Sequence, residues 1–236
     1  MIPLRDANPT RRPALVTLAI IIGCCIVFGW ELGLLARGET DFEGAVTAWG
    51  LVPGRLTAAL GRGEFLSVES GTLLTSQFLH AGWLHLLGNL LYLWIFGNNV
   101  EDRLGRTGFL LFYLAGGVLA GLAQVAIDPG SPVPTIGASG AIAATLGAYL
   151  VFFPRARVTS LVFLGFFYQL VRIPAAIVLG LWFLLQLVDG IGSLGPTQGG
   201  GVAFFAHIGG FVVGAVVAWL VTLLGNGRPA SPPSVG

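Results

Sequence analysis

The stretch TIGASGAIAATLGAY, residues Thr135–Tyr149, decides the fold. It is an apolar run built largely from small residues, and it carries Ser139 between Gly137 and Gly140. Small residues let helix backbones approach each other closely in lipid. The stretch therefore predicts a tightly packed membrane helix with a serine near its start, and we expect the other apolar segments to surround it.

Composition places the rest of the chain in the membrane as well. Of the 236 residues, 55% are hydrophobic and 10% are charged, unlike the composition of a soluble domain. A bilayer core of about 30 Å needs roughly 20 helical residues, so the second and fourth runs below are short. The sequence predicts an all-α membrane protein with six transmembrane helices. The apolar runs are approximately Ala14–Leu35, Leu84–Gly97, Thr107–Ile127, Gly137–Phe153, Ile173–Ile191 and Val202–Leu224.

The arginines give the orientation. With a cytoplasmic N-terminus, six spans leave only Arg37, Arg55 and Arg62 of the 12 basic residues outside. Cytoplasmic segments carry an excess of basic residues, so we expect both ends inside (N-in/C-in). Residues 1–13 then form a cytoplasmic tail, residues 14–224 the bundle, and residues 225–236, rich in Pro, Gly and Ser, a disordered tail.

Two segments lie outside the six runs. The outer loop, about residues 36–83, is too long and in places too apolar for a bare linker, and we expect short helices in the membrane interface. Val158–Val171 is apolar but too short to span comfortably. We interpret it as an interfacial segment or a short hairpin on the cytoplasmic side. The first run is too long for a signal-peptide core and lacks a cleavage site, so we predict a retained helix.

Several classes of function fit poorly. A net charge of +1 without a basic block argues against nucleic-acid binding. Cys24 and Cys25 are adjacent inside the first run and have no third cysteine to pair with, so we assign them no redox or metal role. A transporter would lead us to expect repeats with broken helices or intramembrane charges. We predict no metal and no other cofactor.

Polar side chains in apolar runs are costly in hydrocarbon and are therefore candidates for function. The segment HAGWLHLLGN supplies His80, His85 and Asn89, and AFFAHIGG supplies His207. In the predicted topology, the second, fourth and sixth helices all enter from the outer side. This places His85, Asn89, Ser139 and His207 at one depth in the outer leaflet. His85 and Asn89 are four residues apart and project from one helix face.

This set has the chemistry of a serine hydrolase. A neutral imidazole is the usual base that activates a serine hydroxyl, which assigns Ser139 as the nucleophile and His207 as the general base. The backbone N–H of Ser139 and the side chains of His85 and Asn89 can donate to an oxyanion. We expect no carboxylate in the same layer, so the sequence predicts a Ser–His pair and not a triad.

Taken singly, each of these residues has a plainer interpretation. Ser139 can be packing at a small-residue seam, His207 a hydrogen-bonded core residue, and His85 with Asn89 an interhelical clamp. Only the shared depth of all four favours catalysis.

Three further residues are expected to support the site. Gly137 and Gly140 would let a substrate backbone approach the serine closely. His80 precedes its span, and we expect it near the interface as a supporting polar contact.

These residues resemble a known family. GASG (Gly137–Gly140), HLLGN (His85–Asn89) and AHIGGFVVG (Ala206–Gly214), in this order and spacing, are similar to the motifs of rhomboid intramembrane serine proteases. The longer segment His80–Gly105 resembles the prokaryotic form.

The resemblance implies a six-helix rhomboid-like bundle that cleaves single-pass transmembrane substrates at or near the surface of the lipid bilayer. It implies Ser139 as nucleophile, His207 as base, and His85 and Asn89 with the Ser139 amide as oxyanion hole. It also suggests that the fifth helix and the loop at about Gly190–Gly201 act as gate and lid.

Two departures from the family pattern are visible. Some members carry a Trp-Arg pair in the first outer loop, where this chain has Trp49 and Arg55 apart. Some members also place a tyrosine one turn after the serine, stacked on the catalytic histidine. The corresponding residue here is Ala143.

Other assignments remain as alternatives. A non-catalytic rhomboid-like protein would bind transmembrane helices, but such relatives typically lack the Ser or His that this chain keeps. A zinc protease would need H-E-x-x-H, which is absent, and an aspartyl type would need two intramembrane aspartates, for which Asp189 is the lone candidate. The short N-terminal tail favours a bacterial cytoplasmic membrane, with the active site toward the outer leaflet.

Overall fold

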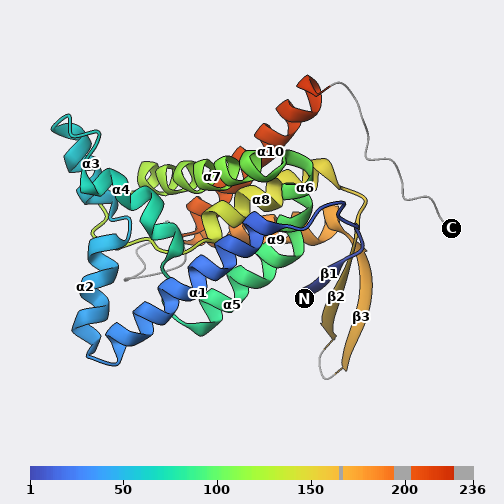
Figure 1. The fold of residues 1–236 in the computed structure, drawn as a ribbon, viewed down its shortest axis with the longest axis horizontal. Coiled ribbons are helices and arrows are strands. Elements are labelled where there is room, and N and C mark those ends of the chain that lie inside the picture. Colours follow the sequence, from blue (N-terminus) through green and yellow to red (C-terminus); the bar gives the residue numbers. More distant parts are fainter. Residues whose placement is uncertain (165–166, 194–202, 226–236) are drawn as a thin grey trace.

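The computed structural model describes residues 1–164, 167–193 and 203–225, and it is mostly helical (Figure 1). The bundle helices are α1 (Leu15–Leu35), α5 (Trp83–Tyr92), α6 (Asn98–Leu104), α7 (Arg106–Ile127), α8 (Ser139–Phe152), α9 (Ala175–Gly192) and α10 (Phe204–Leu224). Most of the stretch Thr135–Tyr149 lies in α8, which is in the middle of the bundle and packs against α7, α9 and α10. A small sheet lies at one end of the bundle (Figure 1).

Several of the described helices suit a membrane. α1, α7, α9 and α10 are each long and apolar enough to cross one. A fifth candidate is the pair Val68–Phe78 and Trp83–Leu104, which is bent by 80° between its two parts. α8 is apolar but has only 14 residues. The predicted helical bundle is confirmed, whereas the count of six spans and the N-in/C-in orientation remain predictions.

The close packing of α8 against α10 follows from their small residues. A Cβ atom at Gly214 of α10 would collide with the carbonyl oxygen of Ala144, and one at Gly147 of α8 would collide with the carbonyl oxygen of Phe211. Backbones this close leave no room for a side chain at either glycine. The tight packing predicted for the helix that carries Ser139 is therefore confirmed, and α10 is the helix that it packs against.

The second apolar run continues further than its hydrophobicity predicts. A π-helical segment, η2 (Leu93–Gly97), joins α5 to α6, and the helix ends only where Gly105 adopts a φ of +74°. The polar residues of α6 have a structural use, because the carboxylate of Glu101 accepts hydrogen bonds from the backbone N–H groups of Val16 and Thr17 at 3.0 and 2.8 Å. Glu101 thus satisfies the first turn of α1, whose own sequence offers no side-chain cap.

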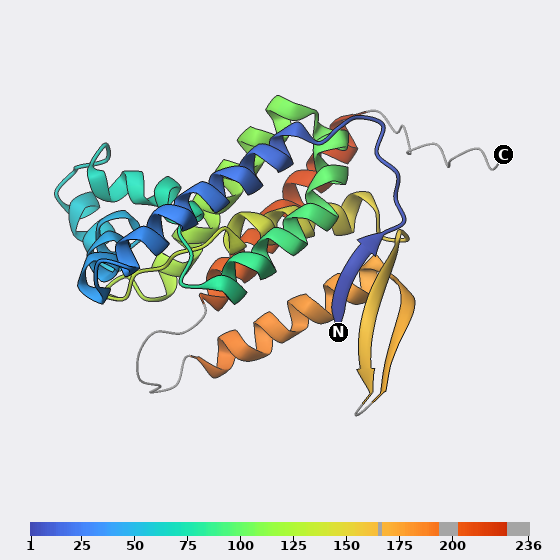
Figure 2. The ribbon, with the colours of Figure 1, turned by 60° about the horizontal axis from the view of Figure 1, so that its bottom comes forward.

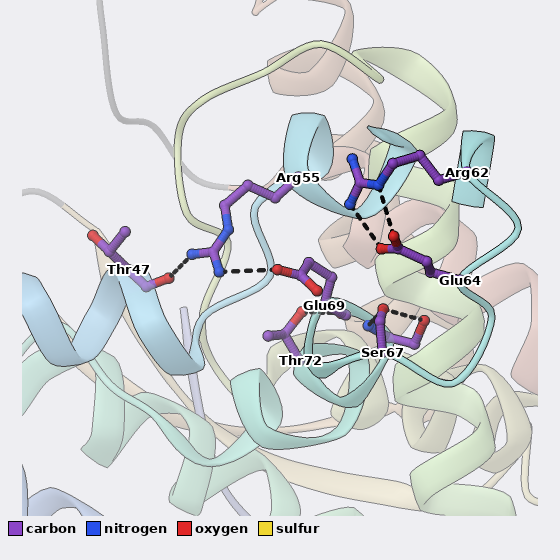
Figure 3. A network of polar contacts seen from close by, with 8 residues as sticks. Thr47, Arg55, Arg62, Glu64, Ser67, Glu69 and Thr72 are labelled. Carbon is purple, nitrogen blue, oxygen red and sulfur yellow. Dashed lines mark hydrogen bonds and ion pairs between the residues drawn. The ribbon is translucent and has the colours of Figure 1, made fainter. Parts of the chain in front are cut away.

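The outer loop contains the short helices that its composition predicts. They are α2 (Glu39–Trp49), α3 (Pro53–Gly61), α4 (Val68–Thr75) and the 3₁₀ turn η1 (Ser76–Phe78). Figure 3 shows the polar contacts among them, in which Arg55 lies 3.2 Å from Glu69 and Arg62 lies 2.7 Å from Glu64. Arg55 also donates to the carbonyl oxygen of Thr47 at 2.8 Å, and so ties α3 to α2. Exposed ion pairs of this kind contribute about 0–1 kcal/mol each.

The sheet was only partly foreseen. Of the two interpretations of Val158–Val171, the hairpin is the one observed, and it pairs with an N-terminal strand that the sequence analysis had treated as tail. The antiparallel order is β1 (Ile2–Asp6), β2 (Arg157–Leu164) and β3 (Phe167–Pro174). Figure 2 shows these strands extending away from the bundle beside the start of α9.

Asp6 fastens β1 to the bundle. Its Oδ2 atom accepts hydrogen bonds from the hydroxyl of Tyr149 at 2.7 Å and from the side-chain amide of Asn99 at 2.8 Å. Burial raises the pKa of Asp6 above its ordinary value, although both hydrogen bonds oppose the shift.

Two expectations fall on residues outside the described part. The proposed lid at about Gly190–Gly201 overlaps the end of α9, but residues 194–202 lie outside the described residues. Residues 226–236 of the expected C-terminal tail also lie outside them.

Candidate active site

Ser139 is the first residue of α8, and the loop before it contains a glycine with a positive φ. Gly137 has a φ of +122°, a conformation that residues with a side chain rarely adopt. Its N–H donates to the carbonyl oxygen of Ser76 at 2.8 Å, so the loop is held against the end of η1. The backbone conformation of Gly137 therefore sets the path of the loop that leads into Ser139.

His207 reaches Ser139 across the seam between α8 and α10. The Nε2 atom of His207 lies 2.7 Å from the Oγ atom of Ser139. The two helices can come this close because a Cβ at Gly210, one turn after His207, would collide with the carbonyl oxygen of Gly140. The histidine is 9% exposed, whereas Ser139 is half-buried, so the serine is the more accessible member of the pair.

His85 and Asn89 face the loop before Ser139. A Cβ built on Gly137 would lie 2.6 Å from Nε2 of His85 and 3.7 Å from Nδ2 of Asn89. Asn89 is 8% exposed, and its Nδ2 atom is buried without a hydrogen-bond partner among the described residues. Two side-chain donors of α5 thus point to the same side of the loop, beside the serine.

His80 is packed against His85. Its side chain is fully buried in the protein, and its ring centroid is 5.1 Å from that of His85. Its Nδ1 atom is 3.1 Å from the carbonyl oxygen of Phe78, and its backbone N–H donates to the carboxylate of Glu31 at 3.0 Å. Its place at the membrane interface and its supporting role remain predictions.

The structure therefore brings the predicted residues together. Ser139 and His207 form a hydrogen-bonded pair, and His85 and Asn89 lie against Gly137, two residues before Ser139. Gly140 lies at the helix seam, where its carbonyl is packed against α10, so its observed contact is with a helix.

Three nearby residues were missed from the sequence. The carbonyl oxygen of the Gln186 side chain lies 2.6 Å from Nδ1 of His207, and the ring of Trp182 lies 6.0 Å from the His207 ring. Glu31, buried in α1, is a carboxylate in a region where none was expected. Gln186 and Glu31 could have been found from the sequence, because a polar side chain inside an apolar run is costly in lipid and is therefore a candidate for function.

The arrangement is suited to proton transfer from a hydroxyl. At 2.7 Å, Ser139 and His207 are within the distance that a general base requires. Donors without partners nearby are what a developing oxyanion would use. In the described part of the chain, no group of three or more His, Cys, Asp or Glu side chains could hold a metal ion.

Fold and site together define a helical membrane protein with a partly buried serine–histidine pair. Comparison with known proteins gives the family: the rhomboid domain family model matches residues 68–223. The chain belongs to the rhomboid family, and the resemblance noted from its motifs is confirmed. It is accordingly an integral membrane protein with several apolar helices.

Individual relatives agree with this assignment. The chain is 40% identical over 195 residues to the rhomboid protease GluP of Bacillus subtilis, an alignment that covers 83% of this chain and 34% of the relative. It is 32% identical over 156 residues to the chloroplastic rhomboid-like protein 11 of Arabidopsis thaliana, with 63% and 51% covered. It is 27% identical over 160 residues to the mitochondrial rhomboid protein 1 of Saccharomyces cerevisiae, with 64% and 42% covered. The matched region thus spans only about a third to a half of each relative.

Proposed function

We propose that this protein is an intramembrane serine endopeptidase that hydrolyses peptide bonds in or near the transmembrane segments of other membrane proteins. The observation that carries the proposal is the 2.7 Å contact between Nε2 of His207 and Oγ of Ser139. A histidine at this distance is the general base that a serine nucleophile needs. A relative that bears the name of a rhomboid protease supports the same conclusion.

The reaction begins when Ser139 Oγ attacks the carbonyl carbon of the scissile peptide bond. His207 Nε2 takes the hydroxyl proton as the new C–O bond forms, and then donates that proton to the leaving amine nitrogen when the C–N bond breaks. The product is an ester between Ser139 and the N-terminal fragment of the substrate. Water then attacks the ester, His207 again accepts and returns a proton, and a carboxylic acid and free Ser139 result.

The negative charge of each tetrahedral intermediate needs preorganised donors. We assign this role to the backbone N–H of Ser139 and to the side chains of His85 and Asn89. The support is geometric, because both side chains lie against Gly137 and because the Asn89 amide donor is buried without a partner among the described residues. Each such donor is worth about 2.7–4 kcal/mol in a site shielded from water.

The setting of the reaction belongs to the proposal too. We propose six spans with both ends in the cytoplasm, a bundle over about residues 14–224, and a site facing the outer leaflet. Single-pass membrane proteins are the proposed substrates, and the bacterial cytoplasmic membrane the proposed location. The named relatives include bacterial, mitochondrial and chloroplast proteins, so family membership alone leaves the membrane open.

The test is cleavage of a single-span substrate by the purified full chain in liposomes. We expect cleavage by the native protein and a loss of at least about 10³-fold for both Ser139→Ala and His207→Ala. As a matched control, Thr222→Ala removes a hydroxyl that donates to the Ala218 carbonyl near the end of α10, and we expect it to retain activity. Undiminished cleavage by either site variant would rule out the mechanism. Binding of the substrate without cleavage by the native chain would favour the non-catalytic alternative.

A further inference from the structure

We infer that Gln186 of α9 is a positioning residue that holds His207 in the tautomer and orientation required of a general base. The inference rests on the proposed protease function and adds to the Ser–His pair a residue that the sequence motifs do not contain. Some family members have a tyrosine stacked on the catalytic histidine where this chain has Ala143, which has no group that could orient His207. Gln186 supplies the missing orienting contact.

The hydrogen-bond chain fixes the tautomer. Oε1 of Gln186 lies 2.6 Å from Nδ1 of His207, and Oγ of Ser139 lies 2.7 Å from Nε2 on the opposite edge of the same ring. An amide oxygen can only accept a hydrogen bond, so Nδ1 carries the proton. A neutral imidazole has one N–H, which leaves Nε2 with a lone pair that can take the proton of the serine.

α9 also places an aromatic ring beside the histidine. Trp182 lies one turn before Gln186, on the same side of the helix. The ring centroids of Trp182 and His207 are 6.0 Å apart, with the planes inclined by 36°. Trp182 contacts Phe211 of α10 at the same centroid distance of 6.0 Å. One helix face thus supplies the hydrogen-bond acceptor of Gln186 and the neighbouring ring of Trp182, and together they restrict rotation of the imidazole.

A glutamine suits this place better than an acid. An uncharged partner orients the ring without favouring its cationic form, so the base stays available at lower pH. A carboxylate would have to be held inside the membrane region, where an ionised group is costly. Gln186 carries no charge, so it acts on His207 through the geometry of their 2.6 Å hydrogen bond.

This arrangement makes the base depend on three helices. Ser139 belongs to α8 and His207 to α10, but the acceptor that sets the tautomer belongs to α9, at the edge of the bundle (Figure 2). Displacing α9 would leave Ser139 and His207 in place and remove the partner of Nδ1. Turnover should then fall although the Ser–His pair is intact.

The test uses two substitutions at Gln186 in the reconstituted full chain. Gln186→Met has a similar length but no strong acceptor, and we expect kcat to fall about tenfold or more while KM stays within about twofold. Gln186→Glu restores an acceptor, so it should recover part of the lost kcat. Its negative charge would favour the imidazolium, so the acid limb of the pH–rate profile should move to higher pH.

The control variant is Leu185→Ala. It changes a neighbouring side chain of α9 that is 58% exposed, and its kcat and KM should equal those of the native chain. The inference is overturned if Gln186→Met keeps kcat within about twofold of native, or if Gln186→Glu is as impaired as Gln186→Met with an unmoved acid limb. In either case, if Ser139→Ala is inactive, the proposed protease function still holds. If Ser139→Ala is active, the proposed function is itself wrong.

Discussion

The backbone of Gly137 lies directly against the imidazole of His85, so that a Cβ on the glycine would come 2.6 Å from Nε2. The same glycine has a φ of +122°. The positive φ of residue 137 and the closeness of His85 each require glycine at this position, two residues before Ser139. This contact holds the loop before Ser139 against α5.

Gly137→Ala should consequently impair both folding of the loop and catalysis. The strained backbone is expected to cost about 1–3 kcal/mol, and displacement of His85 should lower kcat by about 10²-fold. Gly130→Ala, in the same loop but with open space around its Cβ position, is the matched control. Thermal unfolding in detergent and a cleavage assay would measure the two effects. Native activity in Gly137→Ala would show that His85 is not needed where it lies.

Asn89→Ala tests the oxyanion role. The variant should lower kcat by about 10²–10³-fold and leave KM nearly unchanged, because the donor acts mainly in the transition state. Leu87→Ala on the same helix, with a side chain that is 53% exposed, should have little effect on either constant. A variant that mainly raises KM would instead assign Asn89 to substrate binding.

Gly214→Ala tests the seam that brings the serine and the histidine together. The new methyl group would collide with the carbonyl oxygen of Ala144, and we expect a loss of about 1–3 kcal/mol in the free energy of unfolding as α8 and α10 separate. Activity should fall with it, since the distance between Ser139 and His207 depends on this approach. Gly180→Ala on α9, where the Cβ position is open, should be tolerated. Equal stability of the two variants would contradict the seam.

Asp6→Ala tests the attachment of the N-terminal strand. The change leaves the buried Tyr149 hydroxyl without its acceptor and removes one of the two acceptors of the Asn99 amide, which should cost about 1–3 kcal/mol. Asp6→Asn keeps an acceptor and should cost less.

The same carboxyl group should make stability depend on pH. Burial raises the pKa of Asp6 in the folded protein, so the unfolded chain releases the proton at lower pH. The Asp6 contribution to stability is therefore largest below the unfolded pKa and is lost as pH rises through the folded pKa. The thermal midpoint of Asp6→Asn should lack this part of the pH dependence. An identical pH profile for the native chain and Asp6→Asn would show that Asp6 does not ionise differently on folding.

The core of the candidate site could be predicted because lipid makes polar residues conspicuous. Ser139, His207, His85 and Asn89 stand out in apolar runs, and counting helix directions placed them at one depth without any knowledge of contacts. The glycine and alanine spacing of α8 and α10 likewise indicated which helices approach closely.

The features that could not be predicted depend on which face of a helix points into the bundle and on where the ends of the chain lie. A single glutamine in the fifth apolar run does not reveal whether it faces lipid or the bundle, so Gln186 was overlooked. The strand Ile2–Asp6 is only five residues long and pairs with a segment more than 150 residues away, as in the pairing of Ile2 with Leu161. The extension of the second helix through Glu101 was hidden by its polarity, because the carboxylate serves α1 and not its own helix.

The most direct measurement of the central claim is peptide mapping by mass spectrometry after treatment of the folded full chain with a fluorophosphonate. Such reagents phosphonylate a serine that a neighbouring base has activated, with loss of fluoride. We predict one adduct, on Ser139, that forms in the native chain and is lost in His207→Ala although that variant remains folded. An unmodified Ser139 in a native chain that still cleaves substrate, or labelling that is undiminished in His207→Ala, would contradict the account.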